Sequence, residues 1–216
     1  MNTGRNRYGS GFLKAMIKNI VFDIGNVLTD FRWKGFLEDR GFDEAMIKRI
    51  EKATVDSRYW HEFDRGEMSY EEIVKGFISE DPELEDTLRT TFADIKGMVT
   101  PRDYAIPWIK HIKESGYRVY YLSNFSEKAY YECSDALTFE PYCDGGIYSY
   151  RVKIIKPEPE MYRLLCSTYD LEPGECLFFD DLSRNVRAAV RCGYKSFVFT
   201  NPDKANEDMR RLGVKV

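Results

Sequence analysis

VFDIGNVL, residues 21–28, brings one carboxylate, Asp23, to the end of an apolar run and into a Gly-Asn turn. The run itself, residues 17–22, is short and bounded by turn residues, which is typical of a strand buried on both faces. In parallel α/β sheets, ligands bind in the crevice outside the carboxyl ends of the strands. Asp23 is therefore poorly placed for a core and well placed for an active site.

Four later apolar runs predict further strands of the same sheet. They cover residues 117–122, 146–149, 176–179 and 196–199, and the second is the weakest because it contains Gly and Tyr. Helical patterns alternate with them at residues 104–114, 127–137, 158–169 and 184–192. Strands that alternate with helices indicate βαβ units, and hence a parallel sheet with right-handed crossovers.

One interval breaks this alternation. About one hundred residues separate the end of the first strand from the end of the second, whereas a βαβ unit needs only about thirty. Residues 31–98 read as a series of helices, with a capping box at Ser69 and Glu72 and with Pro82 at an early helical position. The pattern predicts a helical insertion directly after the Asp23 turn.

These patterns divide the chain into a core and a cap. The core comprises residues 15–31 and 99–216, and the cap, residues 32–98, is expected over the carboxyl edge of the sheet. Residues 1–14 lack the apolar segment of a signal peptide, and we expect them to form a disordered tail.

The composition argues against several classes of protein. Of the 216 residues, 43% are apolar and 31% are charged, as in globular domains, and the net charge is −4. The negative charge disfavours a nucleic-acid partner, and no apolar run is long enough to span a membrane. Five cysteines without a C-x-x-C pair, with only two histidines, indicate free thiols in a reducing compartment rather than Cys–His catalysis. We therefore expect a cytoplasmic protein, and both a monomer and a homodimer remain open.

Three positions along the predicted core carry polar side chains that could handle a phosphate group. Asp23 is a candidate nucleophile, because a carboxylate can attack phosphorus and split hydrolysis into two displacements. Ser123 and Asn124 follow the second strand, where a hydroxyl and backbone N–H groups can cradle an anion. Lys156, between two isoleucines and a proline that begins a helix, is positioned to neutralise phosphate charge. Taken singly, each is better explained as an ordinary turn, cap or surface residue.

An acidic pair ends the fourth predicted strand, in the segment FFDDLSRN at residues 178–185. Asp180 and Asp181 are costly at the end of an apolar strand unless a cation lies beside them. Magnesium prefers oxygen ligands, usually one or two carboxylates together with waters and substrate phosphate. Because the carboxyl ends of parallel strands share one edge, all these groups are expected to converge there.

This ordered set of residues resembles the haloacid dehalogenase superfamily, whose four motifs occur in the same order. The resemblance extends from Ile17 to about Thr200, and the helical insertion looks like the first cap type of that superfamily. It implies a Rossmann-like three-layer α/β core and a magnesium-dependent phosphatase for a small phosphorylated metabolite. The D-x-G-N-V form at residues 23–27 is similar to a subgroup that includes alpha-D-glucose-1-phosphate phosphatase.

The resemblance also implies the metal site. Asp23 would be both the nucleophile, through an aspartyl-phosphate intermediate, and a magnesium ligand. The backbone carbonyl of Gly25 would be a second ligand, and Asp181 a third. Asp180 would not bind the metal directly. It would act through a water molecule or by supporting the direct ligands.

The remaining motif residues would bind the phosphoryl group. By the same resemblance, Ser123 and the backbone N–H of Asn124 hold the phosphoryl oxygens. Lys156 would share its charge between the phosphate and Asp23, and Asn185 would orient the acidic loop.

The chain departs from the common family pattern at Gly25, where most members carry a second Asp. That residue protonates the leaving group and deprotonates the hydrolytic water, and such help is worth about 10²–10⁴-fold in rate. An anomeric sugar oxygen leaves with less help than an ordinary alcohol. Among sugar phosphates, a sugar 1-phosphate is therefore the favoured substrate.

Two other functions stay open. A 2-haloacid dehalogenase also lacks the second Asp, since a halide needs no proton, but it uses no metal and would leave Asp180 and Asp181 without a purpose. Alternatively, the chain is a binding or regulatory protein that kept the fold and lost proton transfer.

Substrate choice is expected to depend on the cap. Trp33, Trp60, His61 and Arg65 are candidates to face the site, although each is more often a packing or solvated residue. Arg151 and Lys153 are interpreted as part of a solvated strand face.

Overall fold

The computed structural model describes residues 16–216, so the tail expected at residues 1–14 lies outside the described residues. Its centre is a five-stranded sheet in the order β5-β4-β1-β6-β7, in which every neighbouring pair is parallel. The strands are β1 (Asn19–Phe22), β4 (Arg118–Ser123), β5 (Gly145–Tyr148), β6 (Cys176–Asp180) and β7 (Lys195–Val198). All five expected strands are confirmed, including the weak one at β5.

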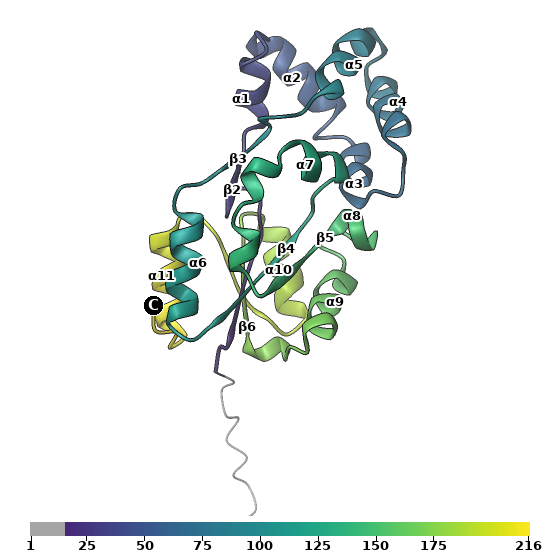
Figure 1. Ribbon diagram of the computed structural model, residues 1–216. Helices are drawn as coiled ribbons and strands as arrows, with labels where there is room; N and C mark the ends of the chain where they lie inside the picture. Colours follow the sequence, from purple (N-terminus) through teal and green to yellow (C-terminus); the bar gives the residue numbers. More distant parts are fainter. Residues whose placement is uncertain (1–15) are drawn as a thin grey trace, which may run out of the picture.

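Helices cover both faces of this sheet, which makes a three-layer core (Figure 1). In β1, Ile20 and Phe22 pack into the cluster that holds α6 (Ala105–Glu114) and α11 (Pro202–Arg211). Val21, between them, points into a separate cluster on the other face. That cluster includes residues of α9 (Pro159–Tyr169) and α10 (Ser183–Arg191). Alternate side chains of a strand point to opposite faces, so both faces of β1 need apolar residues.

Several elements differ from the sequence prediction. The helix expected at residues 127–137 is instead α7 (Glu127–Glu132) followed by the 3₁₀ turn η2 (Ser134–Leu137). The helix α11 was not expected, because it is almost entirely polar and only three of its residues are buried. The sequence also did not predict three short elements, α8 (Ser149–Val152) and the 3₁₀ turns η3 (Glu140–Tyr142) and η4 (Pro173–Glu175).

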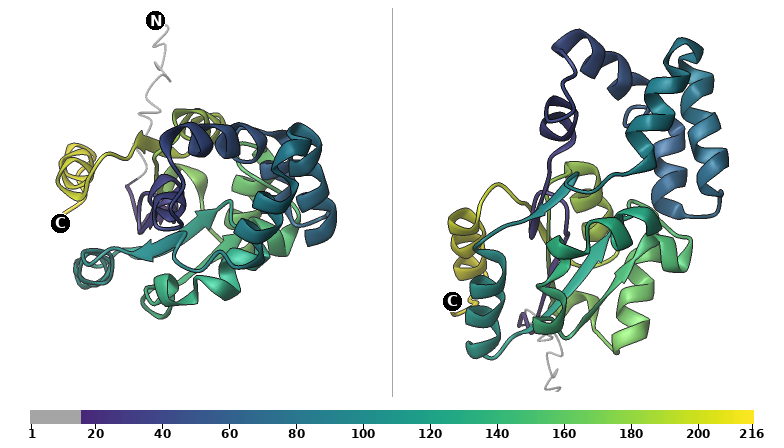
Figure 2. Two further views of the ribbon diagram at one scale, coloured as in Figure 1. Left: turned by 90° about the horizontal axis from the view of Figure 1, so that it is seen from above. Right: turned by 45° about the horizontal axis from the view of Figure 1, so that its top comes forward.

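A layer of helices stands beyond the end of the sheet that carries Asp23 (Figure 1, Figure 2). It contains α1 (Trp33–Glu38), α2 (Glu44–Ala53), α3 (Arg58–Arg65), α4 (Tyr70–Glu80), η1 (Pro82–Leu84) and α5 (Glu85–Ala93). The expected capping box starts α4, where the Ser69 hydroxyl and the Glu72 carboxylate each accept a backbone N–H of the other residue. Trp60, Phe77 and Phe92 form part of an aromatic cluster that joins these helices.

The chain enters and leaves this layer through two paired segments. Strand β2 (Thr29–Phe31) pairs antiparallel with β3 (Val99–Pro101), a ribbon that the sequence analysis did not anticipate. The pairing brings together the two positions at which we divide core from cap, 31/32 and 98/99. The division itself remains our interpretation of the arrangement. Within residues 16–216, no helix has the length and apolar character needed to cross a membrane.

Candidate active site

A cavity of about 600 Å³ lies where the carboxyl ends of β1, β4 and β6 face helix α3. The core contributes lining residues that follow the strands: Asp23, Gly25, Asn26, Asn124, Lys156, Asp181 and Asn185. Helix α3 contributes Trp60, His61 and Asp64 from the opposite side. The residues that the motifs singled out therefore meet at one edge of the sheet, as the parallel topology requires.

Lys156 lies at the centre of the charged groups. Its ammonium is 2.8 Å from Asp23 Oδ1 and 2.7 Å from Asp180 Oδ2, and its side chain is only 1% exposed. Burial lowers the pKa of Lys156, but the charges of Asp180 and Asp23 outweigh that effect and raise it overall. Lys156 is thus a fixed positive charge between two carboxylates.

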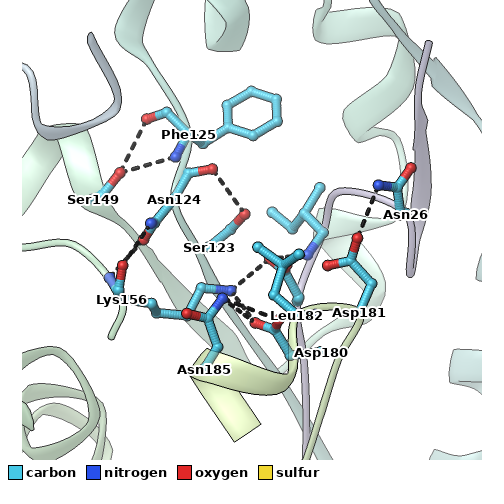
Figure 3. Close-up of polar contacts among 12 residues, drawn as sticks. Asn26, Ser123, Asn124, Phe125, Ser149, Lys156, Asp180, Asp181, Leu182 and Asn185 are labelled. Carbon is cyan, nitrogen blue, oxygen red and sulfur yellow. Dashed lines mark hydrogen bonds and ion pairs between the residues drawn. The ribbon is translucent and has the colours of Figure 1, made fainter. Parts of the chain in front are cut away.

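Both oxygens of the Asp180 carboxylate accept hydrogen bonds from groups of the protein (Figure 3). Oδ1 accepts the Leu182 backbone N–H at 2.8 Å, the Asn185 amide donates to both oxygens at 3.0 Å, and Oδ2 also accepts from Lys156. Asp180 is buried completely. The sequence predicted a cation beside the acidic pair, and for Asp180 the neighbouring cation is the Lys156 ammonium. An indirect role of Asp180 on a metal stays a prediction.

Asp181 is held differently, by a residue that the sequence analysis did not single out. The amide of Asn26 donates to Asp181 Oδ2 at 2.9 Å (Figure 3). Asn26 Oδ1 accepts the Phe31 backbone N–H at 3.2 Å. Asn26 has φ 56°, a left-handed conformation that Asn tolerates better than most residues. The Gly-Asn pair of the first motif was the available signal, because Asn in a tight turn often bonds to nearby groups.

The acidic groups form a set that could hold a divalent cation. Carboxylate oxygens of Asp23, Asp180 and Asp181 lie within 4.8 Å of one another. Three carboxylates against the one ammonium of Lys156 leave two negative charges uncompensated. Burial raises the pKa of Asp23 to about 7, against the effect of Lys156 and with help from the other two carboxylates. A hard divalent ion with a preference for oxygen ligands, such as magnesium, matches this donor set.

Asn124 fixes the segment that carries Lys156. Its amide donates to the Lys156 carbonyl at 2.9 Å, and its Oδ1 accepts the Lys156 backbone N–H at 2.7 Å (Figure 3). Ser123 is 1% exposed, and its hydroxyl donates only a long hydrogen bond of 3.4 Å to the Asn124 carbonyl. Asn124 lines the cavity and Ser123 does not, in the part of the chain that the structure describes. A contact of Ser123 with phosphate stays a prediction.

The four cap residues proposed from the sequence separate into two pairs. Trp60 and His61 line the cavity. Trp33 instead packs among the aromatic side chains of the cap, with its ring 5.4 Å from that of Trp60. Arg65 is paired with Glu158 of the core at 2.6 Å.

Two predictions about the neighbouring loop were wrong. Arg151 lies on helix α8, and Lys153 directly follows it, so neither belongs to a strand face. The guanidinium of Arg151 lies over the Tyr130 ring at 4.6 Å, and the Lys153 ammonium donates to the Gly66 carbonyl of the cap. Both residues hold local structure.

A cavity-lining residue of the cap that sequence reasoning did not single out is Asp64. It lies in the cavity lining, and its backbone carbonyl accepts the Ser149 hydroxyl at 2.6 Å. Burial and, next, the negative charge of Asp23 raise the pKa of Asp64 to about 7. No local pattern marks it, because its place at the cavity depends on how α3 packs against the core.

A model of the family described as haloacid dehalogenase-like hydrolase matches residues 17–193. The chain belongs to this family. The match covers the Asp23 turn, the cap and the acidic pair, and therefore spans every group described above. The recognition of the superfamily from the four motifs is confirmed, while the narrower subgroup stays a prediction.

Individual relatives agree with this placement. D-ribitol-5-phosphate phosphatase of Bacteroides thetaiotaomicron is 28% identical over 202 residues, which cover 84% of this hydrolase and 91% of the relative. A HAD-like hydrolase of Porphyromonas gingivalis has a similar structure, with TM-score 0.69, 20% identity, and 94% and 100% of the two chains covered.

A second solved structure is a HAD family enzyme of Bacteroides thetaiotaomicron in complex with magnesium and inorganic phosphate. Its TM-score is 0.63 at 23% identity, with 86% of this hydrolase and 96% of that chain covered. At these identities the two solved structures establish the shared fold alone.

Proposed function

We propose that this hydrolase is a magnesium-dependent phosphatase that cleaves a small phosphorylated metabolite through an aspartyl-phosphate intermediate on Asp23. The observation that carries the proposal is the charged cluster at the cavity floor. Asp23 is held by the Lys156 ammonium at 2.8 Å, with the carboxylates of Asp180 and Asp181 beside it. Relatives named as phosphatases, including the one for D-ribitol 5-phosphate, support the same reaction.

In the first step an oxygen of Asp23 attacks phosphorus and the bond to the leaving oxygen breaks. Lys156, whose side chain is 1% exposed, neutralises the charge shared by Asp23 and the transferring group. In the second step water attacks the phosphoryl group, which releases inorganic phosphate and restores the Asp23 carboxylate. Ser123 and the backbone N–H of Asn124 are proposed to hold the phosphoryl oxygens.

Magnesium would be held by Asp23, the Gly25 carbonyl and Asp181, and when bound it supplies additional charge stabilisation. Asp181 is the better direct ligand of the acidic pair, because only one of its oxygens is bonded, to Asn26. Both oxygens of Asp180 already accept hydrogen bonds, so Asp180 acts on the metal through water. Asn185 holds Asp180, and thereby the acidic loop, in place.

For the substrate we propose a sugar or polyol phosphate. A cavity of about 600 Å³ suits a small metabolite, and Trp60 offers an aromatic surface of the kind that packs on sugar rings. Within this class a sugar 1-phosphate is favoured by its leaving group, because an anomeric oxygen depends less on an acid than an ordinary alcohol oxygen does. The five cysteines are all free thiols, which favours a reducing compartment and hence the cytoplasm.

The function is tested by phosphate release from a panel of phosphorylated metabolites, with and without magnesium, for wild type and for Asp23→Asn. Metal-dependent release that the variant lacks is the expected result. Chloride release from a 2-chloro acid without metal would identify a dehalogenase, and inactivity on both panels would identify a binding protein. Sugar 1-phosphates are compared directly with 5- and 6-phosphates, and a clear preference for the latter contradicts the leaving-group argument.

A further inference from the structure

Gly25 leaves a gap where the usual family acid would stand. A Cβ built on this residue has no neighbouring atom within 4 Å, and its backbone has no positive φ that would demand glycine. The space beside the nucleophile is therefore open to the cavity. Any group that transfers a proton to the leaving oxygen has to reach into it from elsewhere.

Asp64 is a carboxyl group of the cap that lines this cavity and, unlike the exposed Asp56, is half-buried. It lines the same cavity as Asp23 and Gly25, on helix α3. Among residues 16–216 its carboxyl has neither a hydrogen bond nor an ion pair, unlike Asp180 and Asp181. A half-buried acid without a protein partner is free to bond to a substrate.

The backbone around Asp64 is fixed to the core. The Ser149 hydroxyl donates to the Asp64 carbonyl at 2.6 Å and accepts the Phe125 backbone N–H at 2.9 Å. Phe125 directly follows Asn124, so one hydroxyl joins Asp64 to the proposed phosphate-binding turn. The ion pair between Arg65 and Glu158 adds a second connection next to Asp64. Proton transfer requires a group that is held in a fixed position relative to the substrate, and these contacts hold helix α3 against the core.

We propose that Asp64 performs the proton transfers that position 25 lacks in this enzyme, an inference that rests on the phosphatase function proposed above. In the first step the Asp64 carboxyl gives its proton to the leaving oxygen as the phosphorus–oxygen bond breaks, which forms the free alcohol. In the second step the Asp64 carboxylate takes a proton from the attacking water as phosphate leaves Asp23. Over both steps one water is consumed and Asp64 returns to its starting state.

The electrostatic surroundings agree with this role. Burial raises the pKa of Asp64 to about 7, so near neutral pH the residue can both donate and accept a proton. The charged and titratable groups that share the cavity are Asp23, Lys156, Asp181, Arg184, His61 and Asp56. His61 is the other candidate on the same helix, but burial and the positive charge of Arg184 lower its pKa and so disfavour the protonated form that would donate.

The test is the dependence of rate on the leaving group. Wild type and Asp64→Asn are assayed with magnesium on 4-nitrophenyl phosphate, whose leaving group needs no proton, and on an alkyl phosphate such as ribitol 5-phosphate. We expect kcat/KM to fall by less than about 10-fold on the first substrate and by about 10²–10³-fold on the second. Asp64→Ser repeats the test should the amide disturb folding.

Matched controls separate proton transfer from damage to the cap. Glu67→Gln changes an exposed carboxylate close to Asp64 in the chain and is expected to leave both rates unchanged. His61→Gln removes the other titratable side chain that α3 contributes to the cavity. We expect it to leave the ratio of kcat/KM between 4-nitrophenyl phosphate and the alkyl phosphate unchanged. An equal loss on both substrates in Asp64→Asn, or no loss, overturns the proposal. Hydrolysis of 4-nitrophenyl phosphate by wild type and its loss in Asp23→Asn test the phosphatase function separately.

Discussion

The two sides of the cavity hold their acidic residues in different ways. On the core side, Asp180 is held by hydrogen bonds and by Lys156, Asp181 accepts a hydrogen bond from Asn26, and Asp23 is paired with the same lysine. On the cap side, the backbone of Asp64 is fixed while its carboxyl is unbonded in the described chain. This difference agrees with the two roles proposed above. The core side would transfer the phosphoryl group, a step with constant geometry, and the cap side would meet a leaving group that changes with the substrate.

The largest predicted effect on the core side concerns Lys156. Lys156→Met leaves Asp23 and Asp180 buried without their cation, so we expect a loss of about 3–5 kcal/mol in the free energy of unfolding. Where the variant folds, kcat should fall by about 10²–10³-fold. Urea unfolding and steady-state kinetics measure the two effects. Unchanged stability would show that the lysine does not neutralise the two carboxylates.

The gap at Gly25 gives a second prediction, in the opposite direction. Gly25→Asp places an acid in open space beside the nucleophile, so in the Asp64→Asn background we expect it to raise kcat/KM on alkyl phosphates by up to about 10²-fold. In wild type, where Asp64 transfers the proton, the gain should be much smaller. Gly25→Ala is the control, since it adds the Cβ without the acid. A rise in the alanine variant would assign the effect to backbone rigidity.

Metal and pH are predicted to act together on the core side. Burial raises the pKa of Asp23 from 3.8 to about 7 in the metal-free protein, so the folded state keeps a proton that the unfolded state has lost. Stability of the metal-free protein should therefore fall as pH rises from about 4 to about 7. Magnesium should raise Tm more at pH 8 than at pH 5, because protons compete with it at low pH.

Asp23→Asn and Asp181→Asn provide the comparison for this pH effect. Each variant should show a smaller fall in Tm with pH and a smaller magnesium shift than wild type. Thermal unfolding at several pH values measures both. A magnesium shift that is the same at pH 5 and pH 8 would contradict the assignment of the carboxylates as its ligands.

The smallest predicted effect lies on the cap side, at the pair of Arg65 with Glu158. The pair is partly exposed, and its loss in Arg65→Met should cost less than about 1 kcal/mol of stability. We expect KM to rise by a few-fold with little change in kcat. A double-mutant cycle with Glu158→Gln measures the coupling. Fully additive effects would show that this contact does not hold the cap segment against the core.

The positions of the candidate core-side residues could be predicted from the sequence for a physical reason. Asp23, Asn124 and Asp180 each follow an apolar strand, and parallel strands bring their carboxyl ends to one edge of a sheet. Lys156 could be found in the same way, from its position between isoleucines and a proline. These positions depend on local patterns and on the handedness of βαβ units, both of which can be read along the chain.

The rest depends on contacts between distant segments. Asp64 reaches the cavity only because α3 is attached to Ser149 and Glu158, and no periodicity predicts those contacts. The pairing of Asn26 with Asp181 joins two turns that are far apart in sequence. Helix α11 is largely polar, so its apolar signal was too weak to detect.

The covalent intermediate tests the central claim most directly. Wild-type protein with magnesium and an excess of its best phosphorylated substrate is quenched in acid during turnover, and its peptides are analysed by mass spectrometry. The account predicts one added phosphoryl group on the peptide that contains Asp23, and none in Asp23→Asn. Phosphate release without that adduct, together with full activity in Asp23→Asn, would contradict it.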